Sequence, residues 1–232
     1  MATLFIVATP IGNLEDLSMR ALRILKEVDF ILCEDTRVTK KILNYYQIEK
    51  PILSYHQHSR LKKVNYILEL LKQGKNLALV SDAGTPGISD PGGKLINFLI
   101  KTPGLVIKIV PIPGPSAATA AASISGLPMD KFLFLGFPPT KRKRKKFFQE
   151  VIKSKYPVIF YESPYRIIKS LRDLQLISKT YNLKPKIVVC RELTKKFETI
   201  YRGKIEEVIK EIEKNPRGEF VVIVSPKTWK RK

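Results

Sequence analysis

Short apolar runs rich in valine and isoleucine alternate with amphipathic stretches along the first half of the chain. The clearest amphipathic stretch is Ser59–Gln73, where apolar residues recur on one helical face and Gly74 follows as a C-terminal stop. Such alternation predicts a mostly parallel sheet covered by helices. The predicted strands are Leu4–Ala8, Phe30–Cys33, Leu77–Val80 and Val106–Val110, and the predicted helices are Met19–Val28, Thr36–Tyr46, Ser59–Gln73 and Gly93–Lys101.

The segment PIPGPSAATAAASISG, residues 111–126, breaks this pattern. Its prolines make a stiff joint, and the small residues after them favour a closely packed helix. We expect a domain boundary here, between an N-terminal α/β domain of residues 1–112 and a C-terminal α/β domain of residues 113–232. In the second domain the predicted strands are Lys131–Phe137, Pro157–Tyr161, Lys186–Arg191 and Phe220–Ser225, with Phe197–Tyr201 as an edge strand, and the predicted helices are Arg144–Lys153, Pro164–Leu174 and Lys204–Lys214.

A glycine-rich loop, LVSDAGTPGISDPGG at residues 79–93, follows the apolar run Leu77–Val80. A loop in this position commonly brings backbone close to a ligand. It lacks the G-x-x-x-x-G-K-[ST] pattern of a phosphate loop and the G-x-G-x-x-G pattern of a dinucleotide site. Asp82 and Asp90 would also repel a polyphosphate. The loop therefore suits a cationic or hydroxyl-rich ligand, and the alternative is a tight series of turns that binds nothing.

The chain is strongly basic, with 42 Lys and Arg against 21 Asp and Glu, a formal net charge of +21. The excess is uneven, because residues 1–112 carry 15 − 10 = +5 and residues 113–232 carry 27 − 11 = +16. A basic excess on this scale indicates a polyanionic partner, either a nucleic acid or an anionic membrane surface.

Cysteine usage and the N-terminus bear on the compartment. Cys33 and Cys190 lie at the ends of distant apolar runs and are interpreted as reduced thiols of a cytosolic protein. The start MATLFIVATP has no positive n-region and is predicted to be a strand, not a signal peptide. No apolar run approaches the roughly 18 residues of a membrane span. We therefore expect a soluble, cytoplasmic protein.

Short segments with a distinctive composition stand at the expected strand ends. They are ATPIGN (8–13), CEDTR (33–37), SDAGTPGISDPG (81–92), PGPSA (113–117), FLGFPP (134–139), YESPYR (161–166), RELTK (191–195) and GEFVVIV (218–224). Single segments are weak evidence, but together, in order over nearly the whole chain, they resemble the tetrapyrrole methylase superfamily. Within it, the chain resembles the branch that methylates the ribose 2′-hydroxyl of a cytidine in the decoding region of 16S ribosomal RNA.

The resemblance implies that S-adenosylmethionine (SAM) binds in a cleft between the two α/β domains, and that the enzyme is a homodimer. SAM carries a sulfonium and an ammonium group but no phosphate, which agrees with an acidic, glycine-rich loop. The alternative for the apolar residues among the implied cofactor contacts, Ile88, Ala117, Phe160 and Phe220, is that they are ordinary core residues. The cofactor contacts implied by matched position are Pro10, Gly84, Thr85, Ile88, Ser116, Ala117, Phe160, Tyr161, Glu219 and Phe220.

Methyl transfer to a hydroxyl requires alignment of the reactants and an acceptor for the hydroxyl proton. The candidates for that acceptor are Glu34, Asp35, His56, His58 and Glu162, and we favour Asp35 and His56. Alternatively, Asp35 and Glu34 form a structural pair with Arg37, and the two histidines contact solvent or RNA phosphate. The H-x-H spacing lacks an evident third metal ligand, and the family needs no metal, so no metal site is predicted.

Basic residues are the candidates for contact with RNA. Lys141–Lys146 consists entirely of cations (KRKRKK), a pattern that usually indicates a solvated or disordered segment. Its place beside FLGFPP favours phosphate contact here. The RNA-binding candidates are Arg37, Lys141, Arg142, Lys143, Arg144 and Arg166, with Arg191 and the tail Lys230–Lys232 as further possibilities.

Two other functions compete with methylation of 16S ribosomal RNA in the small subunit. One is SAM-dependent C-methylation of a corrinoid precursor, which belongs to the same superfamily. The segments ATPIGN and CEDTR and the charge of +21 argue against it. The other is a ribosome-binding protein without catalytic activity, and the intact cofactor segments argue against that.

Overall fold

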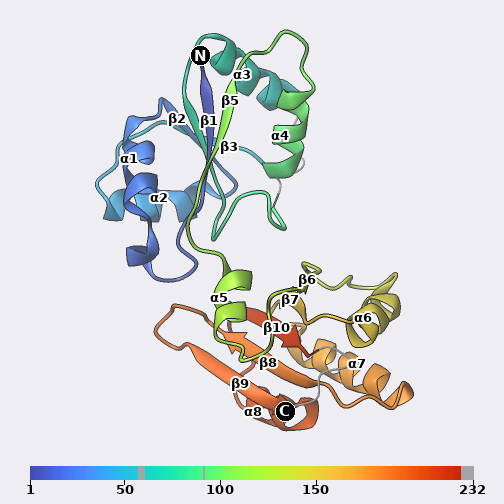
Figure 1. The fold of residues 1–232 in the computed structure, drawn as a ribbon. Helices are drawn as coiled ribbons and strands as arrows, with labels where there is room; N and C mark the ends of the chain where they lie inside the picture. The colour runs from blue at the N-terminus through green and yellow to red at the C-terminus, as the bar shows by residue number, and fades with distance from the viewer. Residues whose placement is uncertain (57–60, 91, 226–232) are drawn as a thin grey trace. The chain divides into compact units, whose positions relative to one another are not determined.

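The computed structural model describes residues 1–56, 61–90 and 92–225 (Figure 1). The chain forms two units, Met1–Ser116 and Ala117–Lys232, each with its own sheet. In the described part of the chain, no helix is both long and apolar enough to cross a membrane. The prediction of an α/β protein with two α/β domains is confirmed.

The first unit is built on a five-stranded sheet in which every neighbouring pair is parallel. The strand order is β3-β2-β4-β1-β5. β4 is the most enclosed strand, because all four of its side chains are buried. The strands are β1 (Thr3–Val7), β2 (Phe30–Cys33), β3 (Ile52–Ser54), β4 (Leu77–Val80) and β5 (Lys108–Ile112).

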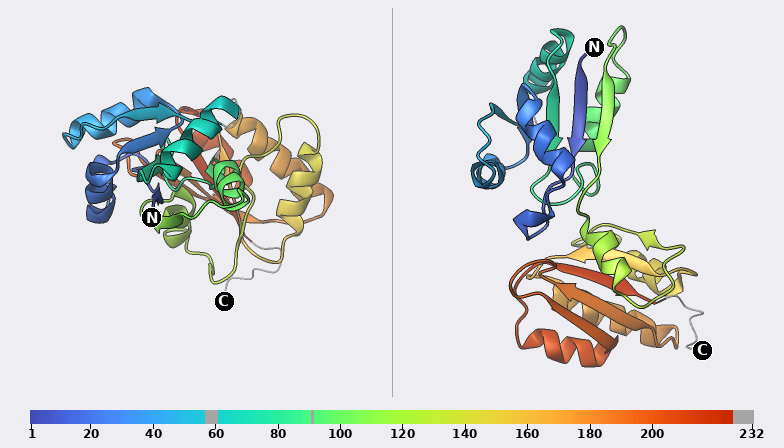
Figure 2. Two further views of the ribbon diagram at one scale, coloured as in Figure 1. Left: turned by 90° about the horizontal axis from the view of Figure 1, so that it is seen from above. Right: turned by 60° about the vertical axis from the view of Figure 1, so that its left-hand side comes forward.

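Helices cover both faces of this sheet (Figures 1 and 2). Helices α1 (Met19–Glu27) and α2 (Thr36–Tyr45) pack with one face of the strands, and α3 (Leu61–Lys72) and α4 (Gly92–Ile100) pack with the other. A short 3₁₀ helix, η1 (Leu14–Asp16), precedes α1. The Ser18 hydroxyl caps α1 by accepting a hydrogen bond from the Ala21 N–H at 3.1 Å.

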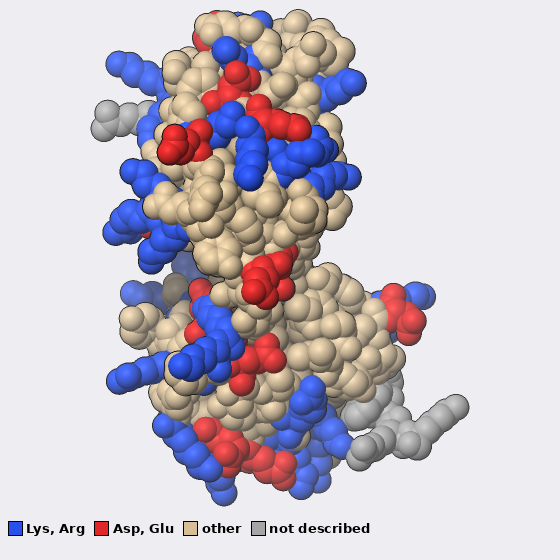
Figure 3. All heavy atoms as spheres, turned by 90° about the vertical axis from the view of Figure 1, so that its left-hand side faces the viewer, with Lys and Arg blue, Asp and Glu red and all other residues tan. Residues whose placement is uncertain are grey.

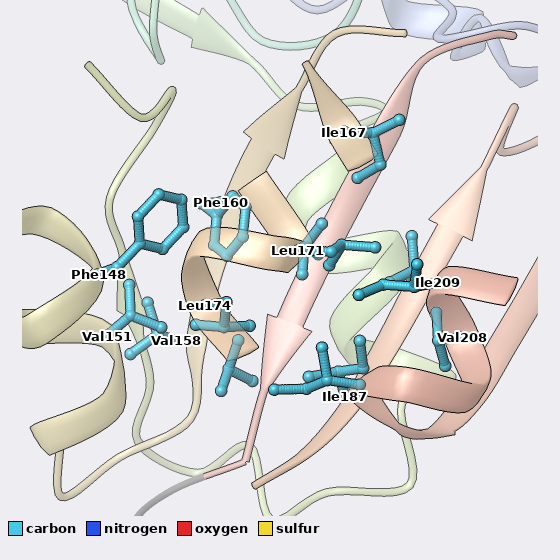
Figure 4. Packing of buried hydrophobic residues seen from close by; sticks show 14 of the residues in the cluster. Phe148, Val151, Val158, Phe160, Ile167, Leu171, Leu174, Ile187, Val208 and Ile209 are labelled. Atoms are coloured by element: carbon cyan, nitrogen blue, oxygen red, sulfur yellow. The ribbon is translucent and has the colours of Figure 1, made fainter. Parts of the chain in front are cut away.

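The second unit has a five-stranded sheet of order β6-β7-β10-β8-β9, in which only β6 and β7 are parallel. Its helices pack on the sheet around a core that includes Phe148, Phe160 and Leu171 (Figure 4). The elements are α5 (Ala117–Ser123), β6 (Leu133–Phe134), α6 (Arg144–Lys153), β7 (Val158–Glu162), α7 (Ile167–Thr180), β8 (Lys186–Arg191), β9 (Thr199–Lys204), α8 (Ile205–Glu213) and β10 (Phe220–Val224).

Most predicted elements are present with shifted ends, and the larger differences have local causes. The predicted strand Lys131–Phe137 reduces to two residues of β6. The predicted start of a helix at Pro164 is wrong, because residues 163–166 form a turn in which the Arg166 N–H donates to the Ser163 carbonyl at 3.1 Å. β3 was missed because it has only three residues. Residues 59 and 60 of the predicted helix Ser59–Gln73 lie outside the described residues.

Candidate functional site

The carboxyl ends of the parallel strands of the first unit meet at one edge of its sheet. β1 and β4 are neighbours, yet the helix after β1 (α1) and the helix after β4 (α4) lie on opposite faces. In open α/β sheets, ligands bind at such a topological switch point. The segments ATPIGN and SDAGTPG leave these two strands, so the sequence candidates Pro10, Gly84 and Thr85 lie at the switch point.

Main-chain contacts hold the loops at this edge together. The Thr9 and Gly84 backbones exchange hydrogen bonds of 2.9 and 3.0 Å, and the Thr85 hydroxyl donates to the Pro115 carbonyl at 3.2 Å. Gly84 has φ +82°, and a Cβ there would lie 3.4 Å from Ile11 Cγ2. A Cβ on Gly114 would lie only 2.9 Å from Ala8 Cβ. Glycine is therefore favoured at Gly84 by its positive φ and needed at Gly114 for the close approach to Ala8.

The remaining candidates of this edge differ in accessibility. Pro10 is buried, Thr85 is partly buried, and the Ile88 side chain is exposed although it is large and apolar. Ser116 is the last residue of the first unit and is partly buried. Ile88 is thus the candidate that offers an apolar surface to a ligand.

Carboxylates from two loops also converge at this edge, Glu34 and Asp35 after β2 and Asp82 and Asp90 after β4. The Asp82 carboxylate accepts a hydrogen bond from the Asp35 N–H at 3.0 Å. Burial, together with the nearby charges of Glu34 and Asp82, raises the pKa of Asp90 to about 6, against a hydrogen bond from Ser81 that lowers it. No group of three or more His, Cys, Asp or Glu residues in the described ranges is arranged to hold a metal ion. The cluster instead makes an electronegative surface.

Asp90 was not among the sequence candidates for the proton acceptor. The sequence places it in the glycine-rich loop, but its proximity to Glu34 depends on β2 and β4 being neighbours in the sheet. No local pattern contains that information. An acceptor whose pKa lies near neutrality is nevertheless the kind of group that general base catalysis uses.

The structure gives Asp35 a structural role. Its carboxylate caps α2 by accepting from the Arg37 N–H at 2.8 Å, and it pairs with the Arg37 guanidinium at 2.6 Å. The Arg37 side chain holds the pKa of Asp35 well below its usual range. Asp35 is therefore a weak base, as the alternative interpretation of this pair expected. Arg37 itself is 87% exposed.

The histidine candidates follow β3. His56 is exposed and lies two residues after the carboxyl end of that strand, on the same edge of the sheet as the loops described above. His58 lies outside the described residues. The assignment of a base at His56 stays a prediction.

In the second unit, four cofactor candidates lie on the neighbouring strands β7 and β10 or just before β10. Phe160 and Phe220 are buried in the core, so only their backbone could contact a ligand. The Tyr161 ring is partly buried and packs edge-on against Phe134 and Phe137, at centroid distances of 4.9 and 5.5 Å. Glu219 is largely exposed and pairs with Lys195 at 2.9 Å. Ala117, the first residue of α5, is partly buried.

One of the RNA-binding candidates is built into the second unit. The Arg144 guanidinium donates to the Asp173 carboxylate at 2.7 Å, the Ser170 hydroxyl at 2.8 Å and the Pro139 carbonyl at 3.1 Å. Arg144 is only 8% exposed, so its guanidinium is not available to phosphate. This is a correction to its sequence-based assignment. It arises because Arg144 begins α6 facing α7, whereas its neighbours face solvent.

The other cations of that run are accessible. We call Lys141, Arg142, Lys143, Lys145 and Lys146 the exposed run, since all five are exposed. Lys145 and Lys146 occupy the first turn of α6, where the helix dipole normally favours acidic residues. On the face drawn in Figure 3, cations are interspersed with carboxylates.

Arg166 belongs to a buried polar network in YESPYR. Its guanidinium pairs with Glu162 at 2.8 Å and donates to the Pro138 carbonyl at 3.1 Å. The Glu162 side chain is fully buried and also accepts from the Ser163 N–H at 2.7 Å and from the Ser170 hydroxyl. Glu162 is thus committed to structure, and Arg166 keeps a side chain that is 26% exposed.

Comparison with known sequences identifies relatives over nearly the full length. The family described as Tetrapyrrole (Corrin/Porphyrin) Methylases matches residues 3–209. A Thermotoga maritima protein named ribosomal RNA small subunit methyltransferase I is 45% identical over 98% of this chain and 100% of its own length. A protein of the same name from Mycoplasmopsis pulmonis is 44% identical over 96% of this chain and 97% of its own length. The family resemblance predicted from the sequence is confirmed.

Solved structures agree on the fold. The methyltransferase CobJ has a TM-score of 0.70 at 18% identity, covering 100% of this chain and 96% of its own. A cobalt precorrin-4 methyltransferase has a TM-score of 0.67 at 18% identity, covering 96% of this chain and 94% of its own. At such low identity these likenesses establish a shared fold and nothing about the substrate.

Proposed function

Because this chain belongs to the tetrapyrrole (corrin/porphyrin) methylase family, we propose that it is a SAM-dependent methyltransferase acting on the ribose 2′-hydroxyl of a cytidine in the decoding region of 16S ribosomal RNA. The observation that carries the proposal is the 45% identity to a ribosomal RNA methyltransferase over 98% of this chain. The cobalt precorrin-4 methyltransferase shares the fold at only 18% identity. Corrinoid C-methylation is therefore the weaker alternative.

The residues at the switch point fit SAM. A Cβ at Gly114 would crowd the neighbouring loop and the positive φ of Gly84 favours glycine, so glycine at these positions lets the loops approach each other at the proposed site. Asp82, Asp90 and Glu34 favour the cationic groups of SAM and disfavour phosphate. The exposed side chain of Ile88 suits an apolar ring. We assign Pro10, Gly84, Thr85, Ile88 and Ser116 of the first unit, and Ala117, Phe160, Tyr161, Glu219 and Phe220 of the second, to cofactor binding.

When bound, SAM supplies an activated methyl group on a positively charged sulfur. The protein then has to align the ribose hydroxyl and accept its proton, and alignment alone is worth up to ~7–11 kcal/mol. Asp90 is the best placed acceptor among the carboxylates of this edge, because its pKa of about 6 leaves it ionised yet basic at neutral pH. Asp35 is a weaker choice, since Arg37 lowers its pKa.

The exposed run is the proposed contact with RNA phosphates, together with Arg37 and Arg166. Two cations in the first turn of α6 are unfavourable next to the positive end of the helix dipole, and a bound anion would offset this repulsion. The net charge of +16 on residues 113–232 agrees with a large polyanion such as the small ribosomal subunit. We further propose that the enzyme is a homodimer, as the resemblance implies. We also propose that it is cytoplasmic, because its proposed RNA substrate is cytoplasmic.

The reaction is tested with small ribosomal subunits from cells that lack this enzyme. A 2′-O-methyl group blocks alkaline cleavage at its 3′ phosphodiester, because that cleavage requires a free 2′-hydroxyl. Treatment with the protein and SAM should therefore remove one band from an alkaline ladder of the 16S RNA. Omission of SAM is the control. A methyl group recovered on a base carbon or nitrogen, with the ladder intact, would refute the proposal.

A further inference from the structure

The most exposed aromatic side chain of the described residues lies in YESPYR. Tyr165 is 95% exposed, although a tyrosine ring carries a large apolar area. Phe137, in the loop after β6, is 50% exposed. β6 and β7 are parallel neighbours, so the loops that carry Phe137 and Tyr165 leave the sheet at the same end.

The backbone that carries Tyr165 is held firmly. The Arg166 and Ile167 N–H groups both donate to the Ser163 carbonyl, at 3.1 and 3.0 Å. The buried Glu162 carboxylate accepts from the Ser163 N–H and from the Arg166 guanidinium. Because the backbone of this turn is already ordered, a planar ligand that stacks on the ring does not have to order the loop as well.

The same contacts bring the exposed run to this end of the sheet. The Arg166 guanidinium donates to the Pro138 carbonyl at 3.1 Å, and the Arg144 guanidinium donates to the adjacent Pro139 carbonyl at 3.1 Å. The loop after Phe137 is thus fixed at both the Tyr165 turn and the start of α6. Lys141, Arg142 and Lys143 follow within a few residues and are exposed.

We infer that Tyr165, together with Phe137 in the loop fixed to the Tyr165 turn, is a stacking platform for an unpaired base of the RNA substrate. Aromatic rings next to a cationic path are the combination that binds single-stranded nucleic acid, since the cations contact phosphates and the rings stack on bases. This inference rests on the proposed function, and it extends that function to unpaired nucleotides. A second copy of the chain is a poorer occupant, because its second unit would bring the same charge of 27 − 11 = +16 to this surface.

Binding of a fluorescein-labelled single-stranded oligocytidine RNA to the full-length protein tests the platform. Tyr165→Ala should weaken binding about 5- to 150-fold, the range found for loss of one stacked base, and Tyr165→Phe and Tyr165→Trp should stay near wild type. The slope of log K against log salt should not change in any of these variants, because no phosphate contact is removed. Tyr156→Ala is the matched control, since Tyr156 is an exposed tyrosine before the opposite end of β7.

Three results would overturn the inference. The first is that Tyr165→Ala binds the RNA with wild-type affinity. The second is that Tyr165→Ala and Tyr156→Ala lose RNA affinity to the same extent. The third is that sedimentation shows Tyr165→Ala as a monomer where the wild-type protein is a dimer. Quenching of a 2-aminopurine base in the RNA adds a direct signature of stacking, which Tyr165→Ala should abolish. Methyl transfer by the wild-type protein into small subunits is measured separately, so failure of the proposed function and failure of the platform are distinguishable.

Discussion

Asp90→Asn should make the first unit more stable at neutral pH while it impairs methyl transfer. Asp90 lies among Glu34 and Asp82 at the ligand edge of the sheet, and its raised pKa means that the folded state disfavours its charge. Asparagine keeps the size and the hydrogen-bonding capacity of the side chain but removes that charge. A gain in stability accompanied by a loss of activity is typical of a residue kept for function.

The magnitude follows from the pKa of Asp90. The pKa rises from 3.8 to about 6, and each pKa unit corresponds to about 1.36 kcal/mol. The charge of Asp90 therefore destabilises the folded state by at most about 3 kcal/mol. Because Asp90 is only partly buried, solvent screening reduces this cost to about 1–2 kcal/mol. The folded state binds the Asp90 proton more tightly than the unfolded state does. The contribution of this protonation to the free energy of unfolding is therefore fully present below pH 3.8 and is lost as pH rises through about 6.

Urea denaturation followed by circular dichroism between pH 4 and pH 8 measures this effect. The variant should exceed wild type by about 1–2 kcal/mol at pH 8, and the difference should shrink toward pH 4. Asp29→Asn is a control of opposite sign, because the Asn76 N–H and Lys75 lower the pKa of Asp29. That variant should be less stable than wild type at pH 8.

Methyl transfer completes the test. If Asp90 accepts the hydroxyl proton, wild-type kcat should rise with pH through about 6 and level off above it, and the variant should lose most of its activity at all pH values. A variant that is no more stable than wild type at pH 8 would refute the electrostatic argument. Unchanged kcat in a stable variant would refute the role of Asp90 as the base.

Three further outcomes follow from the structure. Changing Lys141, Arg142, Lys143 and Lys145 to serine should preserve SAM affinity. It should flatten the slope of log K against log salt for subunit binding by up to ~0.7–0.9 per lost contact, and an unchanged slope would exclude phosphate contact. Arg144→Met should instead cost about 3 kcal/mol of stability in urea denaturation, because Asp173 and Ser170 lose a buried partner; a cost near zero would contradict that role. Gly84→Val should abolish SAM binding in calorimetry. Gly74→Val is the control, because Gly74 has a similar φ of +84° but lies far from the switch point; it should strain the backbone and leave SAM binding intact.

Local features of the fold were predictable because they depend on residues close in sequence. The apolar stripe of Ser59–Gln73 predicted α3, and Phe197–Tyr201 predicted an edge strand that the structure shows as β9, paired only with β8. The composition of the glycine-rich loop predicted a ligand loop without phosphate chemistry, and this stays a prediction. The positive φ of Gly84 is a conformation that glycine adopts without strain, which agrees with a loop rich in glycine.

Features that depend on strand order were not predictable in this way. The sequence by itself determined the family and most of the strands and helices. Only the tertiary structure decided that Asp90 meets Glu34, because β4 lies beside β2, and that Arg144 turns inward to Asp173 while Lys143 and Lys145 stay in solvent. The physical reason is that burial and pKa are set by neighbours tens of residues away in the chain, and local propensity does not encode which of them will be adjacent.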